Sequence, residues 1–185
     1  MAEPAMEFVF YCRDKPNVGA LLERNVEAHW SFMDRYADRL LTRGPTLTDD
    51  GETHTGSLHI VRLDSVVETG TFAYEEPFYR AGVYDAVFIR RWHDRLGRPM
   101  RDFKPDDDVP FYLILGHAEP PSSLAAMLGD RLAVYGWTQP LDGGAWSGFA
   151  AILQAPSRQA IKDRLASALF DASLEIHRWR IGGRH

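Results

Sequence analysis

The pattern of apolar and polar residues predicts a strand followed by a helix at the start of the chain. Residues 7–12 are mostly aromatic and β-branched, which is typical of a strand. Apolar and ring side chains then recur at steps of three and four, the spacing of a helix with one packed face; they are Leu22, Val26, His29, Met33 and Tyr36. The pattern predicts a helix over residues 18–36, capped by Asn17, with His29 pointing inward.

Two further strands, a second helix and a last strand complete this half. Gly44-Pro45 is expected to end the first of these strands, and Pro77 to stop the helix. The expected bounds are residues 40–42 and 56–63 for the two strands, Asp64 or Ser65 to about Glu75 for the helix, and Tyr84 to Trp92 for the last strand. The predicted order is β-α-β-β-α-β.

After residue 92 the pattern is interrupted and then starts again. Residues 93–109 contain Gly97, Pro99, Pro105 and the acidic run 106–108, which predicts a linker or surface excursion rather than a packed element. Beyond it, the hydrophobic pattern predicts strands at 111–115, 132–135, 146–153 and 172–181, and helices at 122–128 and 157–169. The second half therefore has the same predicted order as the first.

Short stretches of the two halves are also similar to each other: residues 39–44 resemble 131–136, and residues 84–92 resemble 170–179. A β-α-β-β-α-β unit forms an antiparallel sheet with both helices on one face, so its other face needs cover. Residues 56–63 carry apolar side chains on both faces. We therefore expect an α+β protein in which two ferredoxin-like repeats, residues 1–92 and 110–185, form a pseudo-dimer within one chain, joined by a linker at 93–109.

Composition and charge narrow the class of protein. The chain has 185 residues, of which 45% are hydrophobic and 25% charged, and its net charge is −5. Its basic residues are scattered, which argues against nucleic acid or an anionic membrane as partner. Cys12 is the single cysteine, which excludes an intramolecular disulfide and favours a cytoplasmic location. We expect a protein without membrane spans that is a monomeric pseudo-dimer or a weak homodimer.

Four short blocks of the first half resemble the YciI-related (YCII) domain family. They are Ala28-His29-Trp30, residues 40–45 (LLTRGP), Thr55-Gly56-Ser57, and residues 76–84 (EPFYRAGVY). The resemblance implies a ferredoxin-like fold that usually pairs as a dimer, here a dimeric α+β barrel type with a degenerate second repeat. It also implies a catalytic dyad of His29 and Glu76 with Ser57 nearby, although the family usually has aspartate in place of Glu76. The best understood member resembles a dehydrochlorinase that acts on a hydroxylated chloroaromatic ring.

The residue types of the dyad suit proton transfer. An imidazole on a packed helix face can act as a general base near neutral pH, and a carboxylate beside it holds its tautomer and stabilises the imidazolium. The alternative interpretations are a core histidine with satisfied hydrogen bonds and an exposed acid at a helix end. Four residues are assigned to substrate binding, with Arg80 as the one able to pair with a carboxylate; they are Ser57, His59, Tyr79 and Arg80.

No metal and no cofactor are expected. His54 and His59 do not have the spacing of a zinc site, and the acidic run 106–108 lacks the pattern of a calcium loop. The sequence has no glycine-rich phosphate loop and no nucleophile elbow. One active pocket per chain is expected, closed by the second repeat, with Tyr135, Trp137 or Trp146 as walls.

The first hypothesis for function is a cofactor-independent enzyme, a lyase of the dehydrochlorinase kind or an isomerase. It would use His29 and Glu76 to remove a proton from a small cyclic or aromatic metabolite. The alternative is a non-catalytic small-molecule binding or accessory protein in which the dyad is vestigial. A third possibility, a cofactor-free oxygenase, rests on analogy of fold alone.

Overall fold

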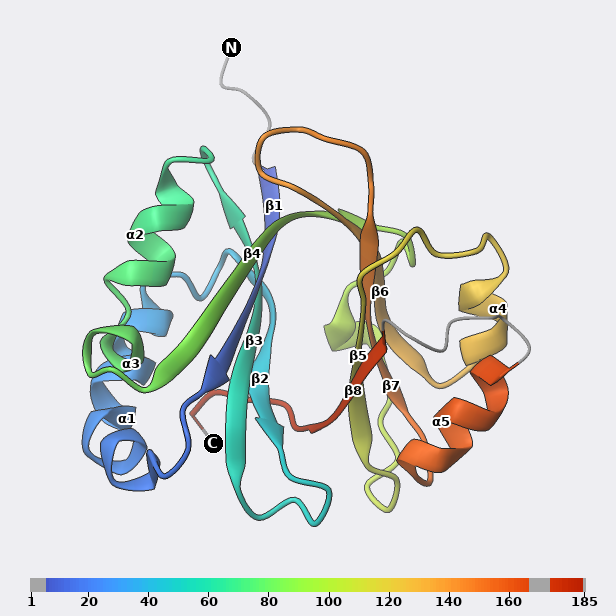
Figure 1. Ribbon diagram of the computed structural model, residues 1–185, viewed down its shortest axis with the longest axis horizontal. Helices are drawn as coiled ribbons and strands as arrows, with labels where there is room; N and C mark the ends of the chain where they lie inside the picture. The colour runs from blue at the N-terminus through green and yellow to red at the C-terminus, as the bar shows by residue number, and fades with distance from the viewer. Residues whose placement is uncertain (1–5, 167–173, 185) are drawn as a thin grey trace.

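The computed structural model describes residues 6–166 and 174–184. Two antiparallel sheets face each other at the centre of the molecule, and the helices cover their outer faces (Figure 1). No helix in these residues is long and apolar enough to cross a membrane.

The first half has the expected order of elements, with one extra helical turn. Its elements are β1 (Met6–Asp14), α1 (Gly19–Asp34), β2 (Leu40–Leu47), β3 (His54–Leu63), α2 (Glu68–Tyr74), α3 (Pro77–Arg80) and β4 (Tyr84–Asp94). Two local predictions were wrong. Val18 occupies the position before α1, because Asn17 adopts a left-handed turn with φ of 60°. The second helix, α2, ends at Tyr74, before Pro77 as expected, and Pro77 then begins α3, since proline suits the first turn of a helix.

The second correction concerns β2, which continues through Gly44-Pro45 instead of ending there. Pro45 is paired in register with Ser57 of β3, and its carbonyl accepts a hydrogen bond from the Arg180 backbone N–H. The strand therefore has partners on both sides, from segments that are distant in the sequence. Tertiary pairing of this kind outweighs the local preference of Gly-Pro for a turn.

The second half repeats the order β-α-β-β-α-β. Its elements are β5 (Phe111–Gly116), α4 (Leu124–Leu128), β6 (Leu132–Gln139), β7 (Gly148–Gln154), α5 (Arg158–Leu165) and β8 (Leu174–Trp179). The predictions for 167–169 as helix and 172–173 as strand lie outside the described residues. The α+β class is confirmed.

The strands of the two halves close into one barrel in the order β1-β3-β2-β8-β5-β7-β6-β4. Each half has the same internal order, β4-β1-β3-β2 and β8-β5-β7-β6. The halves join where β4 pairs with β6 over four residues, Arg91 to Asp94, and where β2 pairs with β8. The second junction is short, since only Thr46 and Leu47 are paired there with Trp179 and Arg178.

Alternating side chains of the strands fill separate cores. Phe8 and Phe10 of β1 pack towards the helices of their own half, whereas Val9 packs between the sheets with Leu58 and Ile60 of β3. The second half contributes Leu113 and Ile152, among others, to the same central core. Each sheet therefore covers the apolar face that the other would leave exposed, which is why β3 is apolar on both faces.

The connection between the halves is more closely packed than its sequence suggests. It contains a short 3-10 helix, η1 (Met100–Asp102), and both Met100 and Phe103 pack against the central core. The Arg98 guanidinium also donates a hydrogen bond to the Leu132 carbonyl of β6. Met100 and Phe103 therefore anchor a connection whose residues from 93 to 109 are otherwise exposed or half-buried.

Candidate functional site

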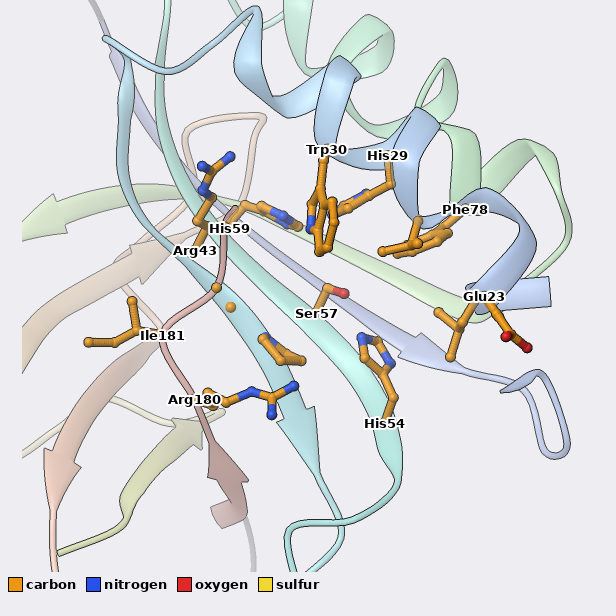
Figure 2. Close-up of a pocket in the computed structure, with 16 residues that line it drawn as sticks. Glu23, His29, Trp30, Arg43, His54, Ser57, His59, Phe78, Arg180 and Ile181 are labelled. Carbon is orange, nitrogen blue, oxygen red and sulfur yellow. The ribbon is translucent and has the colours of Figure 1, made fainter. Parts of the chain in front are cut away.

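A cavity of about 380 Å³ lies on the helix side of the first sheet, between α1, β2, β3 and the chain segment that follows β8 (Figure 2). Its walls combine apolar side chains with imidazole and guanidinium groups. The lining residues on which the argument depends are His29, Trp30, His54, Ser57, His59 and Phe78. Three of the predicted site residues, His29, Ser57 and His59, therefore meet in one cavity.

His29 and Glu76 form a buried pair at the inner wall. The Nδ1 atom of His29 lies 2.5 Å from Oε1 of Glu76, and the two side chains are 11% and 4% exposed. Because Nδ1 is engaged with the carboxylate, Nε2 is the ring nitrogen left for a bound molecule. The predicted dyad is thus brought together, although Glu76 itself stands behind His29 and does not line the cavity.

The backbone after Glu76 fixes its carboxylate. Glu76 occupies the position before α3, and its side chain accepts hydrogen bonds from the backbone N–H groups of Phe78 at 3.0 Å and Tyr79 at 2.9 Å. The ring of Phe78 then stacks on that of His29, with centroids 4.2 Å apart and planes 9° from parallel. The same turn therefore orients both members of the pair.

His59 stands next to His29 on β3, with ring centroids 5.8 Å apart. Burial holds the pKa of His59 well below the usual 6.5, and electrostatic interactions with His29, Arg43 and His54 lower it further. His59 is therefore a neutral imidazole in the folded protein, able to donate or accept a hydrogen bond at the cavity wall. Ser57, two residues earlier on the same face, is also buried.

The low pKa of His59 predicts a specific acid sensitivity. Below pH 6.5 the unfolded chain binds a proton at this residue that the folded chain does not. The free energy of unfolding therefore decreases as the pH is lowered, by up to about 1.4 kcal/mol per pH unit from this group. We expect the stability difference between the wild type and His59→Gln, measured by urea unfolding, to shrink between pH 7.5 and pH 5.5. Parallel pH profiles for the two proteins would contradict the prediction.

Cys12 lies behind the cavity and does not act as a nucleophile in this state. Burial raises the pKa of its thiol, and the nearby carboxylates of Glu76 and Asp14 raise it further. The reactive form of cysteine is the thiolate, which this environment disfavours. The chemistry of the cavity is thus left to its histidines.

The segment that follows β8 closes the cavity from the second half of the chain. Its backbone runs beside β2, where the N–H groups of Arg180 and Gly182 donate to the carbonyls of Pro45 and Arg43. Further along, the Arg184 guanidinium is anchored to α1 through three side chains: Glu27 at 2.6 Å, Asp34 at 2.9 Å and Ser31 at 3.0 Å. The prediction that the second half closes the cavity is met by residues 180–183.

The residues expected as walls lie elsewhere. Tyr135 and Trp137 pack in the core between the second sheet and its own helices, where Trp137 Nε1 donates to the Tyr135 hydroxyl. Trp146 packs against His93. The expectation was wrong because these side chains belong to the far half of the barrel, whereas a segment that carries no aromatic residue reaches the site.

Tyr79 and Arg80 are not brought to the cavity. Both are exposed, and the ring of Tyr79 packs on Tyr74 with centroids 4.9 Å apart. Phe78 is the buried residue of α3, so the single turn directs its other side chains outward. Tyr79 and Arg80 are therefore close to Glu76 in sequence but do not line the cavity.

The polar cavity residues that were not assigned to the site from the sequence include Arg43, Arg180 and His54. Arg43 follows Thr42 in β2, and Arg180 is distant in the chain. His54 is an odd number of positions from Ser57, which in a regular strand places the two on opposite faces. A shift of register between β2 and β3 at this point brings them to one side.

No group of three or more histidine, cysteine, aspartate or glutamate side chains within 6–166 and 174–184 is placed to hold a metal ion. His54 and His59 both line the cavity, and each has its own surroundings. His54 is engaged with Asp14, and His59 packs against His29 and Phe72.

The first half is a ferredoxin-like unit, and its buried histidine–acid pair lies at a cavity between its helices and its sheet. Residues 6–93 match the model of the YCII-related domain. The resemblance seen in the four sequence blocks is thereby confirmed. No curated protein matches the chain in sequence.

Solved structures resemble either about half of the chain or nearly all of it. A 5-chloro-2-hydroxyhydroquinone dehydrochlorinase from Burkholderia phenoliruptrix AC1100 is 28% identical, with a TM-score of 0.45, over 48% of this chain and 95% of its own. A variant of the chlorite dismutase of Candidatus Nitrospira defluvii is 10% identical, with a TM-score of 0.58, over 96% of this chain and 92% of its own. An anthrone oxidase-like protein has a TM-score of 0.52 at 10% identity, over 97% and 92%. The last two show that nearly the whole chain is similar in fold to these proteins.

Proposed function

We propose that the protein is a cofactor-independent enzyme that removes a proton from a small cyclic or aromatic molecule. The observation that carries the proposal is the 2.5 Å pair of His29 and Glu76, buried at the wall of the cavity. A hydrogen-bonded carboxylate fixes the imidazole tautomer and stabilises the imidazolium that forms when the ring takes a proton. Exclusion of water from such a pair strengthens both effects.

The cavity suits a single ring. The side chains of Leu22, Val26, Trp30 and Phe78 supply apolar walls, and Ser57 and His59 supply hydrogen-bonding groups on one side. This combination of apolar walls with a few polar groups is typical of sites for small molecules. An apolar ring that carries hydroxyl groups would place its hydroxyls on β3 and its plane along Phe78.

The reaction follows from the free nitrogen of His29. Nε2 takes a proton from a saturated ring carbon, which a hydroxylated aromatic ring has in its keto tautomer, and the electron pair of the broken C–H bond forms a new C=C bond. In an elimination, the leaving group departs with the electron pair of its own bond. In an isomerisation, a proton returns at another position. Glu76 remains a carboxylate throughout, since its role is to hold the imidazolium.

A turnover assay with a matched variant tests this proposal. We expect a chlorinated hydroxyhydroquinone to lose chloride in the presence of the wild type, and kcat to fall by about 10²–10⁴-fold in His29→Gln, which keeps the side-chain size but removes the base. Chloride release and the quinone absorption give the rate. A folded His29→Gln variant with unchanged turnover would overturn the assignment of the base.

A non-catalytic binding protein is the second candidate. The observation that favours it is that both oxygens of Glu76 accept backbone hydrogen bonds from α3, which is a structural role in its own right. In that case the wild type would bind ring compounds without converting them, and the double variant His29→Gln, Glu76→Gln would bind them equally well.

A further inference from the structure

A second histidine–acid pair stands at the same cavity. The Nδ1 atom of His54 lies 2.6 Å from Oδ2 of Asp14, and the Asp14 side chain is 3% exposed. His54 lines the cavity, whereas Asp14 stands behind it. The arrangement repeats that of His29 and Glu76: a buried carboxylate holds Nδ1, and Nε2 is left for a bound molecule.

Two irregularities of the sheet place this pair. The pairing of β1 with β4 shifts between Arg13 and Asp14, and the pairing of β2 with β3 shifts between Thr46 and Leu47, opposite His54. Irregularities of this kind re-aim side chains and are frequent next to functional sites. Here they turn His54 to the face that carries Ser57.

The two imidazoles approach the cavity from different sides. Both rings contact Phe78: His29 stacks on its face at 4.2 Å between centroids, and His54 meets it edge-on at 6.4 Å. Figure 2 shows the rings of His29, from α1, and His54, from β3, on either side of the Ser57 hydroxyl. A molecule beside Ser57 would therefore lie between two ring nitrogens, each backed by a buried carboxylate.

The second oxygen of the Asp14 carboxylate, Oδ1, indicates that the pair does more than stabilise the strands. Oδ1 of Asp14 is buried and has no hydrogen-bond partner in residues 6–166 and 174–184. A buried acceptor without a partner costs about 1–3 kcal/mol. A purely structural pair would be expected to avoid that cost, whereas a carboxylate that stabilises a transient imidazolium gains from its full negative charge.

We propose that His54 and Asp14 form a second proton-transfer pair, which exchanges a proton with an oxygen or leaving group of the substrate while His29 works at carbon. This inference rests on the proposed function and deepens it. In an elimination, the C–H proton goes to His29, the C–H electron pair forms the C=C bond, and the departing group takes a proton from His54. For a hydroxylated ring, His54 Nε2 takes the hydroxyl proton instead, which leaves an oxyanion and an imidazolium. Asp14 is the positioning residue.

The first test needs no substrate. A proton shared between a buried imidazole and a carboxylate is strongly deshielded, so histidine labelled with ¹⁵N should give two downfield Nδ1–H signals from the cavity. We expect Asp14→Asn to abolish one and Glu76→Gln the other. His117→Gln serves as the control, since His117 pairs with Glu175 in a more exposed place. Survival of both cavity signals in Asp14→Asn would overturn the proposal.

The second test follows the proton with a nitrophenol, whose phenolate absorbs visible light. Ionisation of the bound phenol should occur in the wild type and in His29→Gln, and should fall by about tenfold or more in His54→Gln and Asp14→Asn, equivalent to roughly 1.4 kcal/mol. Ionisation lost only in His29→Gln would overturn this proposal and leave the proposed function standing. No ionisation in the wild type would also overturn it, and chloride release in the turnover assay would then decide the proposed function separately.

Discussion

Replacing Glu76 by alanine is expected to lower both stability and turnover. The variant loses the hydrogen bonds to Phe78 and Tyr79 that begin α3, and it leaves the buried Nδ1 of His29 without its partner. Loss of the cap and of one buried hydrogen bond together cost about 2–4 kcal/mol. Turnover should fall by about 10²-fold or more, because His29 loses its orientation and the charge that stabilises its protonated form. Urea unfolding and the rate of chloride release measure the two effects.

Two neighbouring changes separate these effects. Glu75→Ala removes an exposed acid one position away and should change stability by less than about 0.5 kcal/mol. Glu76→Asp keeps the charge with a shorter reach, so it should retain the cap of α3 while weakening the contact with His29. Equal stability of Glu76→Ala and Glu75→Ala would show that the buried pair contributes nothing to folding.

Replacing Gly44 by alanine should open the cavity. A Cβ atom at Gly44 would lie 2.0 Å from the Arg180 carbonyl oxygen and 2.7 Å from the Trp179 ring, so the segment after β8 must move away. The displaced segment includes residues 180–183 of the cavity wall. We expect a loss of about 1–3 kcal/mol of stability from the steric conflict. We also expect KM to rise by about tenfold, equivalent to roughly 1.4 kcal/mol of binding.

A second glycine provides the matched control. Gly70 lies in α2, where a Cβ would meet nothing within 4 Å. Gly70→Ala should leave KM unchanged and either leave stability unchanged or raise it by about 0.4–1 kcal/mol. If Gly44→Ala behaved like Gly70→Ala, the close approach of the segment to β2 would not be essential for binding.

The sequence was sufficient to predict the parts of the site that depend on local patterns. The spacing of apolar residues around His29 placed it on the inner face of α1, and the resemblance of the block around Glu76 to the YCII family implied its partner. The same approach predicted the order of elements in both halves, because each strand and helix has its own periodicity. These predictions required no knowledge of which distant segments meet.

The remainder of the site depends on long-range geometry. The closing segment reaches β2 only through the junction with β8, and no local pattern indicates that contact. His54 reaches the cavity because the strand register shifts, which spacing along the chain does not reveal. Tyr79 and Arg80 were expected at the site from their proximity to Glu76, but a single helical turn directs them outward.

Because the closing segment is covalently linked to the rest of the cavity, closure of the cavity does not depend on protein concentration. In an assembly of separate subunits, a wall supplied by a neighbour would be lost on dilution. Here Arg180 to Gly183 are tethered to the domain that they cover, so closure is an intramolecular equilibrium with a fixed effective concentration. The fraction of complete cavities is therefore the same in a dilute solution as in a crowded one.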